Sequence, residues 1–150
     1  YGGESPANND IYVNGSSADQ KGFEIEWETV PVWNLSLKAG YSYVHYSPKD
    51  IESGAENAYT ADICLKYEDN QGLNLQLMGY LTDWGLPAER QSEDGKLLWD
   101  LAFSKRLPGF GRISPEVFGA VHNILNQDQY LVPEQKNPDR WMEAGIRIRF

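Results

Sequence analysis

The chain ends in the stretch WMEAGIRIRF, residues 141–150, and this stretch decides the fold. Its apolar and polar side chains alternate strictly. Because successive side chains of a β-strand point to opposite sides, a period of two predicts a strand with one apolar face and one charged face. Such a strand separates two very different media. The apolar positions are Met142, Ala144, Ile146, Ile148 and Phe150, and the intervening positions are Glu143, Gly145, Arg147 and Arg149.

The same period recurs through most of the chain. It predicts an all-β fold: an antiparallel up-and-down meander of about eight strands that occupies residues 11–150. Residues 1–10 are rich in Gly, Asn and Pro and are expected to be a loop or a disordered N-terminus. The pattern at 113–124 predicts a strand without assigning its two faces. The expected strands are 11–14 (the end of a strand), 22–28, 34–46, 58–68, 73–82, 97–106, 113–124 and 141–150.

The connections between these strands are expected to alternate between short and long. The sequence at 69–72, Asp-Asn-Gln-Gly, has good hairpin chemistry, whereas 47–57, 83–96 and 125–140 are long and polar. Membrane β-barrels have tight turns at the periplasmic rim and extended loops at the other rim. The alternation therefore places the C-terminus on the periplasmic side.

The charges are confined to one set of alternate positions. The apolar sets within 23–27, 35–45, 59–67, 73–81, 97–103 and 142–150 contain no Asp, Glu, Lys or Arg. A charge facing lipid costs roughly 2–4 kcal/mol at the midplane of a bilayer, so a lipid-facing surface excludes charges in this way. The opposite positions, which include Glu24, Glu26, Glu28, Arg147 and Arg149, are expected to line a solvated lumen.

Two segments resemble a known family. Residues 121–130, VHNILNQDQY, followed by a polar loop and a last strand that ends in Phe150, resemble the end of a TonB-dependent receptor. Ile124 and Leu125 stand where that family usually has Leu and Phe. A second match is Lys21-Gly22-Phe23-Glu24 after Tyr12-Val13-Asn14, which is similar to an Asn…Lys-Gly-Val-Glu segment of the same family.

This resemblance implies the C-terminal part of a transmembrane β-barrel of about 22 strands in the outer membrane of a Gram-negative bacterium. The parent protein would take up a ferric siderophore, cobalamin or a similar scarce solute. Its implied partners are the lipid bilayer, a plug domain of the same parent chain, the TonB complex through the absent N-terminal part, and that metal-chelate or vitamin ligand. The barrel-assembly machinery would read the terminal alternation of Ile146, Ile148 and Phe150 as its signal. An exported barrel chain without a signal peptide is expected to be a piece of a longer protein.

A soluble alternative shares the same alternation. A lipocalin-like β-barrel with an apolar interior would bind one small apolar ligand. For an isolated fragment of a larger barrel, curling into a small closed barrel is a further alternative. The aromatic positions favour the membrane: Tyr59 and Tyr67 are at the two ends of an otherwise aliphatic face, and Phe23 and Trp27 bracket Ile25. Aromatic girdles at the two membrane interfaces produce this pattern.

The composition excludes several other functions. A net charge of −9 without a basic patch argues against nucleic-acid binding. Cys64 is the only cysteine, and the only histidines are His45 and His122, so no recognisable catalytic or metal motif is present and no cofactor is expected. The protein is therefore not predicted to be an enzyme. Loop residues of types that suit an anionic aromatic chelate are Trp84, Arg90, Tyr130, Arg140 and Trp141, although no ligand-binding residue is assigned.

Overall fold

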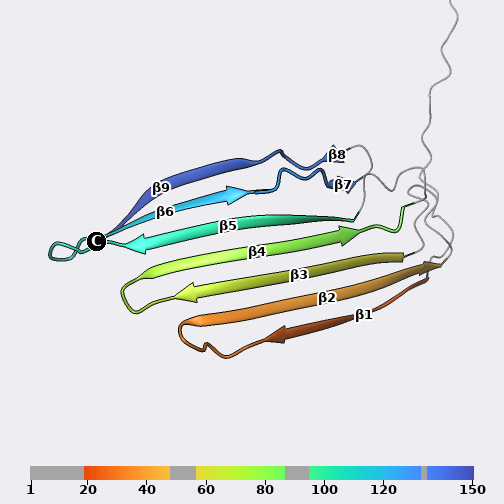
Figure 1. Cartoon of the computed structure of the whole chain (residues 1–150), viewed down its shortest axis with the longest axis horizontal. Helices are drawn as coiled ribbons and strands as arrows, with labels where there is room; N and C mark the ends of the chain where they lie inside the picture. The colour runs from red at the N-terminus through yellow and green to blue at the C-terminus, as the bar shows by residue number, and fades with distance from the viewer. Residues whose placement is uncertain (1–18, 48–56, 87–94, 133–134) are drawn as a thin grey trace, which may run out of the picture.

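The computed structural model describes residues 19–47, 57–86, 95–132 and 135–150. All of the regular structure in these ranges is β, and seven strands form one sheet in the order β1-β2-β3-β4-β5-β6-β9 (Figure 1). Two shorter strands, β7 and β8, pair with each other as a separate hairpin. The bounds are β1 Asp19–Glu28, β2 Leu35–Ser47, β3 Asn57–Glu68, β4 Leu73–Asp83, β5 Lys96–Arg106, β6 Ser114–His122, β7 Tyr130–Val132, β8 Gln135–Lys136 and β9 Trp141–Arg149.

The predicted antiparallel up-and-down meander is confirmed over the described residues. Every strand of the large sheet pairs antiparallel with its neighbour. The strand expected at 113–124 ends earlier, at His122, because Asn123 has a left-handed φ of 50°. The β7–β8 hairpin was not predicted, since strands of three and two residues are too short to show a period. The strand end expected at 11–14 and the segment 1–10 lie outside the described residues.

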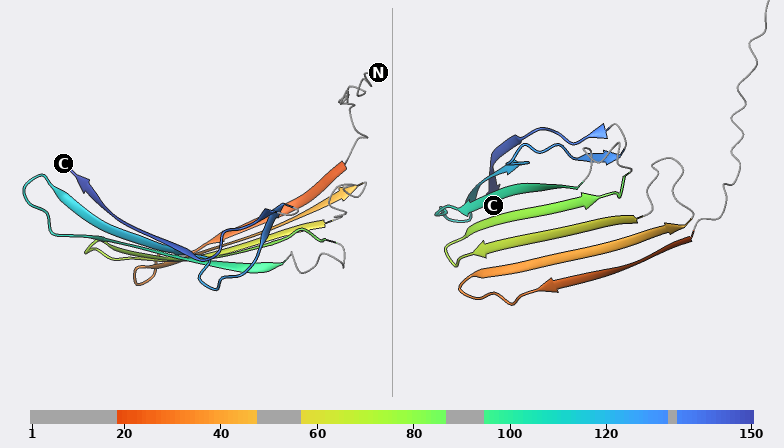
Figure 2. Two further views of the ribbon diagram at one scale, coloured as in Figure 1. Left: turned by 90° about the horizontal axis from the view of Figure 1, so that it is seen from above. Right: turned by 45° about the vertical axis from the view of Figure 1, so that its right-hand side comes forward.

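The sheet is open. Among the described strands, β1 and β9 form the two edges and do not pair with each other, so the small closed barrel considered for an isolated fragment is wrong for this structure. Six antiparallel steps separate β1 from β9, and the two strands therefore run in the same direction. Figure 2 shows that the sheet is twisted and bowed rather than flat, as the right-handed twist of strands requires.

The register places the apolar positions of all seven strands on one face. Residues directly opposite each other in an antiparallel pair project to the same side. One row crosses six strands with apolar side chains throughout, and the rows on either side of it are similar. The register also assigns the faces of β6, with Val117 and Val121 on the apolar face and Glu116 and His122 on the polar face. That row is Leu37, Leu65, Leu77, Leu101, Val121 and Met142.

The connections of the large sheet sort by length to its two ends (Figure 1). The short turns 29–34, 69–72 and 107–113 join strands at one end, and longer connections join them at the other. The C-terminus lies at the end with the short turns. We call the two ends the short-turn end and the long-loop end.

The turn between β3 and β4 depends on one carboxylate, and this leads to a prediction. Asp69 Oδ1 accepts hydrogen bonds from the backbone N–H groups of Gln71 and Leu73, at 2.9 and 2.8 Å. We expect Asp69→Ala to lower the free energy of unfolding by about 1–2 kcal/mol, because these bonds to a charged acceptor are lost. Urea unfolding in detergent micelles measures the change. Asp69→Asn keeps an acceptor and is the control; equal losses in both variants would contradict this role of the side chain.

Candidate functional site

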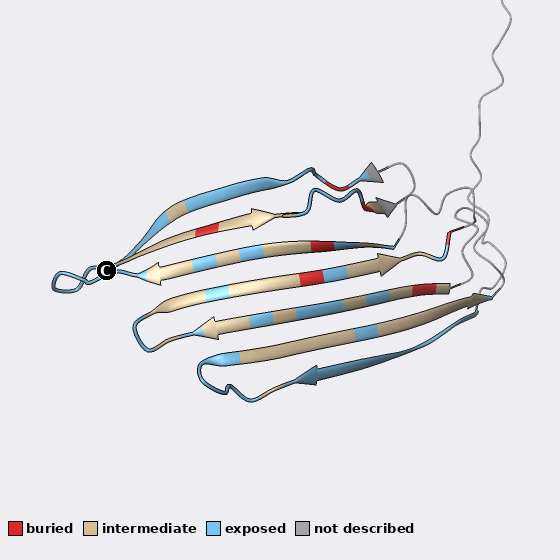
Figure 3. Cartoon of the chain, viewed as in Figure 1, coloured by how far each residue is buried: buried red, intermediate tan, exposed pale blue. Residues whose placement is uncertain are grey.

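The apolar face of the sheet is largely uncovered. Ile25, Leu65 and Ile146, from three different strands, are 61%, 42% and 70% exposed. The buried hydrophobic residues among those described are only Ala58, Leu86 and Leu98, and Figure 3 shows how few positions on the strands are buried. Soluble monomers rarely expose a continuous apolar surface of this extent. The face therefore requires an apolar medium or partner to cover it.

This apolar face is a band with defined margins. At the long-loop end, the rings of Phe23, Tyr43 and Tyr59 lie side by side, with centroids 5.8 and 5.2 Å apart. At the short-turn end, Leu75 of β4 lies directly between Tyr67 of β3 and Phe103 of β5, so these three residues form one row of the sheet. Charged residues of the described strands return to this face only at or beyond these margins: Asp83 lies opposite Tyr59 in the margin row, and Asp19, Lys21 and Lys105 lie beyond the margins.

The opposite face carries the charges, as predicted for Glu24, Glu26, Glu28, Arg147 and Arg149. Most of the charged side chains there pair with a neighbour on the same strand or the next one. Glu24 and Glu28 make no ion pair among the described residues. The ion pairs are Lys38–Glu26 at 3.2 Å, Lys66–Glu68 at 2.7 Å, Arg147–Glu116 at 2.9 Å and Arg149–Glu116 at 3.6 Å.

A cluster on the polar face joins β5, β6 and β9. Asp100 Oδ2 lies 2.9 Å from His122 Nδ1, and Asp100 Oδ1 accepts the N–H of Asn123 at 2.8 Å. The His122 ring stacks on Trp141 with centroids 4.0 Å apart and planes 17° apart. Glu143 Oε1 lies 3.9 Å from His122 Nε2. Trp141, expected among the loop residues, is the first residue of β9, and its ring packs on His122 of β6.

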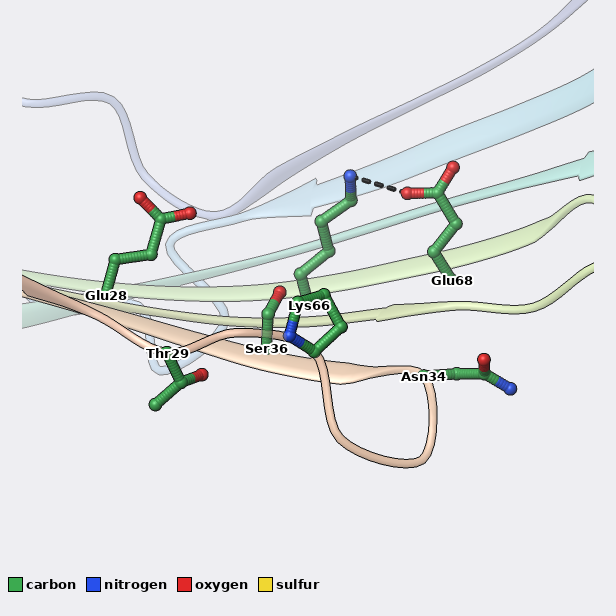
Figure 4. Close-up of a pocket in the computed structure, with 7 residues that line it drawn as sticks. Glu28, Thr29, Asn34, Ser36, Lys66 and Glu68 are labelled. Atoms are coloured by element: carbon green, nitrogen blue, oxygen red, sulfur yellow. Dashed lines mark ion pairs between the residues drawn. The ribbon is translucent and has the colours of Figure 1, made fainter.

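A polar depression lies at the short-turn end of β1, β2 and β3. Figure 4 shows the side chains of Glu28, Lys66 and Glu68 projecting on the same side of the strands. The volume of the depression is about 350 Å³, and all of its lining residues except Pro31 are polar or charged. Because small-molecule pockets are lined mostly by apolar groups, this depression is a part of the hydrated face rather than a ligand pocket. The lining residues are Glu28, Thr29, Pro31, Asn34, Ser36, Lys66 and Glu68.

The connection between β6 and β9 is fastened to the long-loop end by buried amide side chains. Gln129 Oε1 accepts the N–H of Lys96 at 3.1 Å, and Gln129 Nε2 donates to the carbonyl of Thr82 at 3.1 Å. Asn137 Oδ1 accepts the N–H of Gln129 at 2.5 Å. The sequence reasoning did not single out Gln129 or Asn137, and an Asn or Gln in a polar loop gives no signal of such a contact.

Asn123 organises the start of the same connection. Its Oδ1 accepts the N–H of Gln127 at 2.9 Å, and its Nδ2 donates to the carbonyls of Gln127 and Pro138 at 2.8 and 3.2 Å. Asn126, which also has a left-handed φ, accepts the N–H of Arg140 at 2.7 Å. The two asparagines of the segment that resembles TonB-dependent receptors are therefore turn-forming residues.

The proposed ligand-type residues of the loops are only partly brought together. Trp84 Nε1 donates to the carbonyl of Tyr130 at 3.0 Å, which joins two loops 46 residues apart. Arg140 Nη1 donates to the carbonyl of Ile124 at 3.3 Å, so this guanidinium supports the loop. Arg90 lies outside the described residues. Lys136 lies 2.8 Å from Asp128 and 2.9 Å from Asp139, and these carboxylates hold its pKa well above the usual range.

The described ranges contain no group of three or more His, Cys, Asp or Glu side chains that could hold a metal ion. They also contain no helix that is long and apolar enough to span a membrane.

The single cysteine and the first histidine both contact amide side chains of neighbouring strands. Cys64 Sγ lies 3.4 Å from Gln76 Nε2, and His45 Nδ1 lies 3.0 Å from Asn57 Oδ1.

Comparison with protein-family models, curated proteins and solved structures found no match to this chain. Of the positions expected to form the assembly signal, Ile146 and Ile148 lie on the edge strand β9, and Phe150 directly follows it. Their exposed fractions are 70%, 59% and 100%.

The hydrogen bonds of Asn123 lead to a prediction. Asn123→Ala removes three side-chain hydrogen bonds. It also places alanine at a left-handed φ, which asparagine tolerates better. We therefore expect the free energy of unfolding to fall by about 2–3 kcal/mol. Backbone hydrogen exchange should show faster exchange at 124–132 and 135–140, and little change in β2 and β3. Asn126→Ala, which loses one bond to Arg140, should have a smaller effect. Uniform acceleration across the sheet would contradict a local role.

Proposed function

We propose that this chain is a segment of a transmembrane β-barrel, and specifically the C-terminal part of a TonB-dependent receptor in the outer membrane of a Gram-negative bacterium. The observation that carries the proposal is the charge-free apolar face that runs across all seven strands of the sheet, opposite a face of solvated ion pairs. Lipid on one side and a wet lumen on the other produce this division.

The height of the apolar band supports a bilayer as the medium. On β3 the band runs from Tyr59 to Tyr67, which are separated by eight residue steps. At about 3.3 Å per step this is roughly 26 Å along the strand. The band on β2, from Leu35 to Tyr43, and on β4, from Leu73 to Leu81, has the same length. A tilted transmembrane strand needs about 9–11 residues to cross a bilayer, and the nine residues of each band meet this requirement.

The parity of the strands supports an incomplete barrel. Because β1 and β9 run in the same direction, pairing them directly would form a parallel ladder. Single-chain bacterial barrels have an even number of antiparallel strands, so an odd number of strands must be added to these seven. A barrel of 22 strands, as in large outer-membrane transporters, would add fifteen (22 − 7).

The assignment to TonB-dependent receptors depends on the resemblance at 121–130, at 12–24 and at the terminal strand. In that proposal the polar face looks towards a plug domain, and Arg147 and Arg149 are available to its carboxylates because both share the single partner Glu116. The solute would be a ferric siderophore, cobalamin or a similar scarce compound. The barrel-assembly machinery would recognise Ile146, Ile148 and Phe150 on the exposed strand.

No observation favours the soluble lipocalin-like alternative. A barrel with an apolar interior needs a closed sheet that hides its apolar face, whereas the seven strands form an open sheet with that face exposed.

The experiment that tests the receptor assignment is to sequence the gene upstream of the codon for Tyr1 in its genome. We expect a signal peptide, a plug domain and enough alternating segments to complete a barrel of about 22 strands. A reading frame that begins near Tyr1 without a signal peptide would contradict the assignment to an outer-membrane receptor.

A fluorescence experiment tests contact with lipid. Single-tryptophan variants are reconstituted into vesicles of phosphatidylcholine with brominated acyl chains, which quench tryptophans in the hydrocarbon. Trp99 lies on the apolar face and Trp141 on the polar face. We expect strong quenching of the variant that keeps Trp99 and weak quenching of the variant that keeps Trp141. Equal quenching of both, or no association with vesicles, would contradict a lipid-facing apolar side.

A matched pair of substitutions controls for general misfolding in this experiment. Ile63→Arg places a charge on the apolar face of β3, and Cys64→Arg places the same charge one residue later on the polar face. Only Ile63→Arg should reduce insertion into vesicles, by an amount equivalent to about 2–4 kcal/mol near the midplane.

A further inference from the structure

Between Phe23 and Glu28, the free edge of β1 lacks the usual protections against pairing with another strand. Its ten residues, Asp19–Glu28, are all exposed. The register with β2 is continuous from Asp19 opposite Ser47 to Glu28 opposite Lys38, without a bulge. Natural edge strands carry prolines, bulges or inward-pointing charges. Between Phe23 and Glu28 there is no proline, and no charge points to the apolar side. This edge is therefore suited to a further strand.

The side chains of β1 indicate the chemistry of that strand. Three carboxylates, Glu24, Glu26 and Glu28, follow one another on the polar face, and only Glu26 has an ion-pair partner, Lys38 at 3.2 Å. Glu24 is opposite Ser42 and Glu26 is opposite Gly40, so β2 supplies one cation for three acids. Lys38 is directly opposite Glu28, but its ammonium pairs with Glu26, so Glu24 and Glu28 make no ion pair with β2.

The apolar side chains of β1 show the same missing neighbour. Phe23, Ile25 and Trp27 are 53%, 61% and 55% exposed. On the interior strand β3, Ile63 and Leu65 on the same face are 39% and 42% exposed. Among the described strands, none flanks β1 on its outer side, and this accounts for the difference in exposure.

We propose that the free edge of β1 binds an antiparallel strand that carries Lys or Arg opposite Glu24 and Glu28, with aliphatic or aromatic residues at the alternate positions. Opposite charges directly across a strand pair are favourable, and like charges are unfavourable. The apolar positions of the incoming strand would continue the band over Phe23, Ile25 and Trp27. This inference rests on the proposed function, in which the strand belongs to the same barrel.

The charge pattern argues against a second copy of this chain as the occupant. Pairing β1 with β1 of another copy in antiparallel orientation would align glutamates with glutamates. Pairing β1 with β9 of a copy in the same orientation would form a parallel ladder. The polar face of β9 carries Glu143, Arg147 and Arg149, and so it presents both signs of charge, whereas the polar face of β1 presents only carboxylates.

Synthetic strand peptides test the proposal on the whole chain in a neutral detergent. Two ten-residue peptides, the length of β1, share the same apolar residues at alternate positions and carry either Lys or Glu at the others. Fluorescence anisotropy of labelled peptide gives the affinity, and backbone hydrogen exchange locates the site. We expect the Lys peptide to bind about tenfold more tightly than the Glu peptide and to slow exchange in β1. The preference should weaken as salt is added.

Charge-changed variants of the chain make the test specific. Glu24→Lys with Glu28→Lys should reverse the preference between the two peptides, and Glu24→Gln with Glu28→Gln should remove it. Glu143→Lys on β9 is the matched control and should leave it unchanged. Equal binding of the two peptides to the unmodified chain, or protection confined to β9, would overturn the proposal. Lipid contact of the apolar face, measured by quenching, is an independent result, so either idea can fail alone.

Discussion

The structure depends on the register between neighbouring strands. In a single sheet the backbone N–H and C=O groups are satisfied across the strand pairs, and the pleat then determines which side each residue faces. A slip of one residue between β3 and β4 would move the whole apolar set of one strand to the charged side. The register keeps Leu65, Leu77 and Leu101 in one row, and the turn at 69–72 holds the β3–β4 register at the short-turn end. All other features of the two faces follow from this alignment.

The parts of the fold that could be predicted are those in which the period of two is long and clean. The terminal strand and the stretches around Tyr59–Tyr67 and Leu73–Leu81 show it directly, and their faces were assigned correctly. On β6 the period is obscured because Phe118 and Ala120 stand on the polar side. The register puts Phe118 there, and Gly145 opposite it leaves room for the ring, since a Cβ at position 145 would be 2.5 Å from it. A contact between strands decides this face, and one strand's own sequence does not contain it.

The polar side chains could be predicted less well, for a related reason. Asp100 and His122 are 22 residues apart, and only the pairing of β5 with β6 makes them neighbours. Gln129 reaches the ends of β4 and β5 through backbone groups, which are the same for every residue type. The sequence therefore showed that the long connections are polar, without showing which amides are buried. Charge segregation was predictable because it depends only on alternation within each strand.

The scarcity of buried side chains connects the fold to its surroundings. The buried hydrophobic residues among those described are only three, whereas Phe23, Ile25 and Trp27 on β1 are more than half exposed. Burial of apolar surface is the main favourable contribution to folding, so further stabilisation has to come from covering the apolar face. Under the proposed function, lipid hydrocarbon covers this face on all seven strands at once. The stability of this sheet is therefore a property of the sheet together with its solvent.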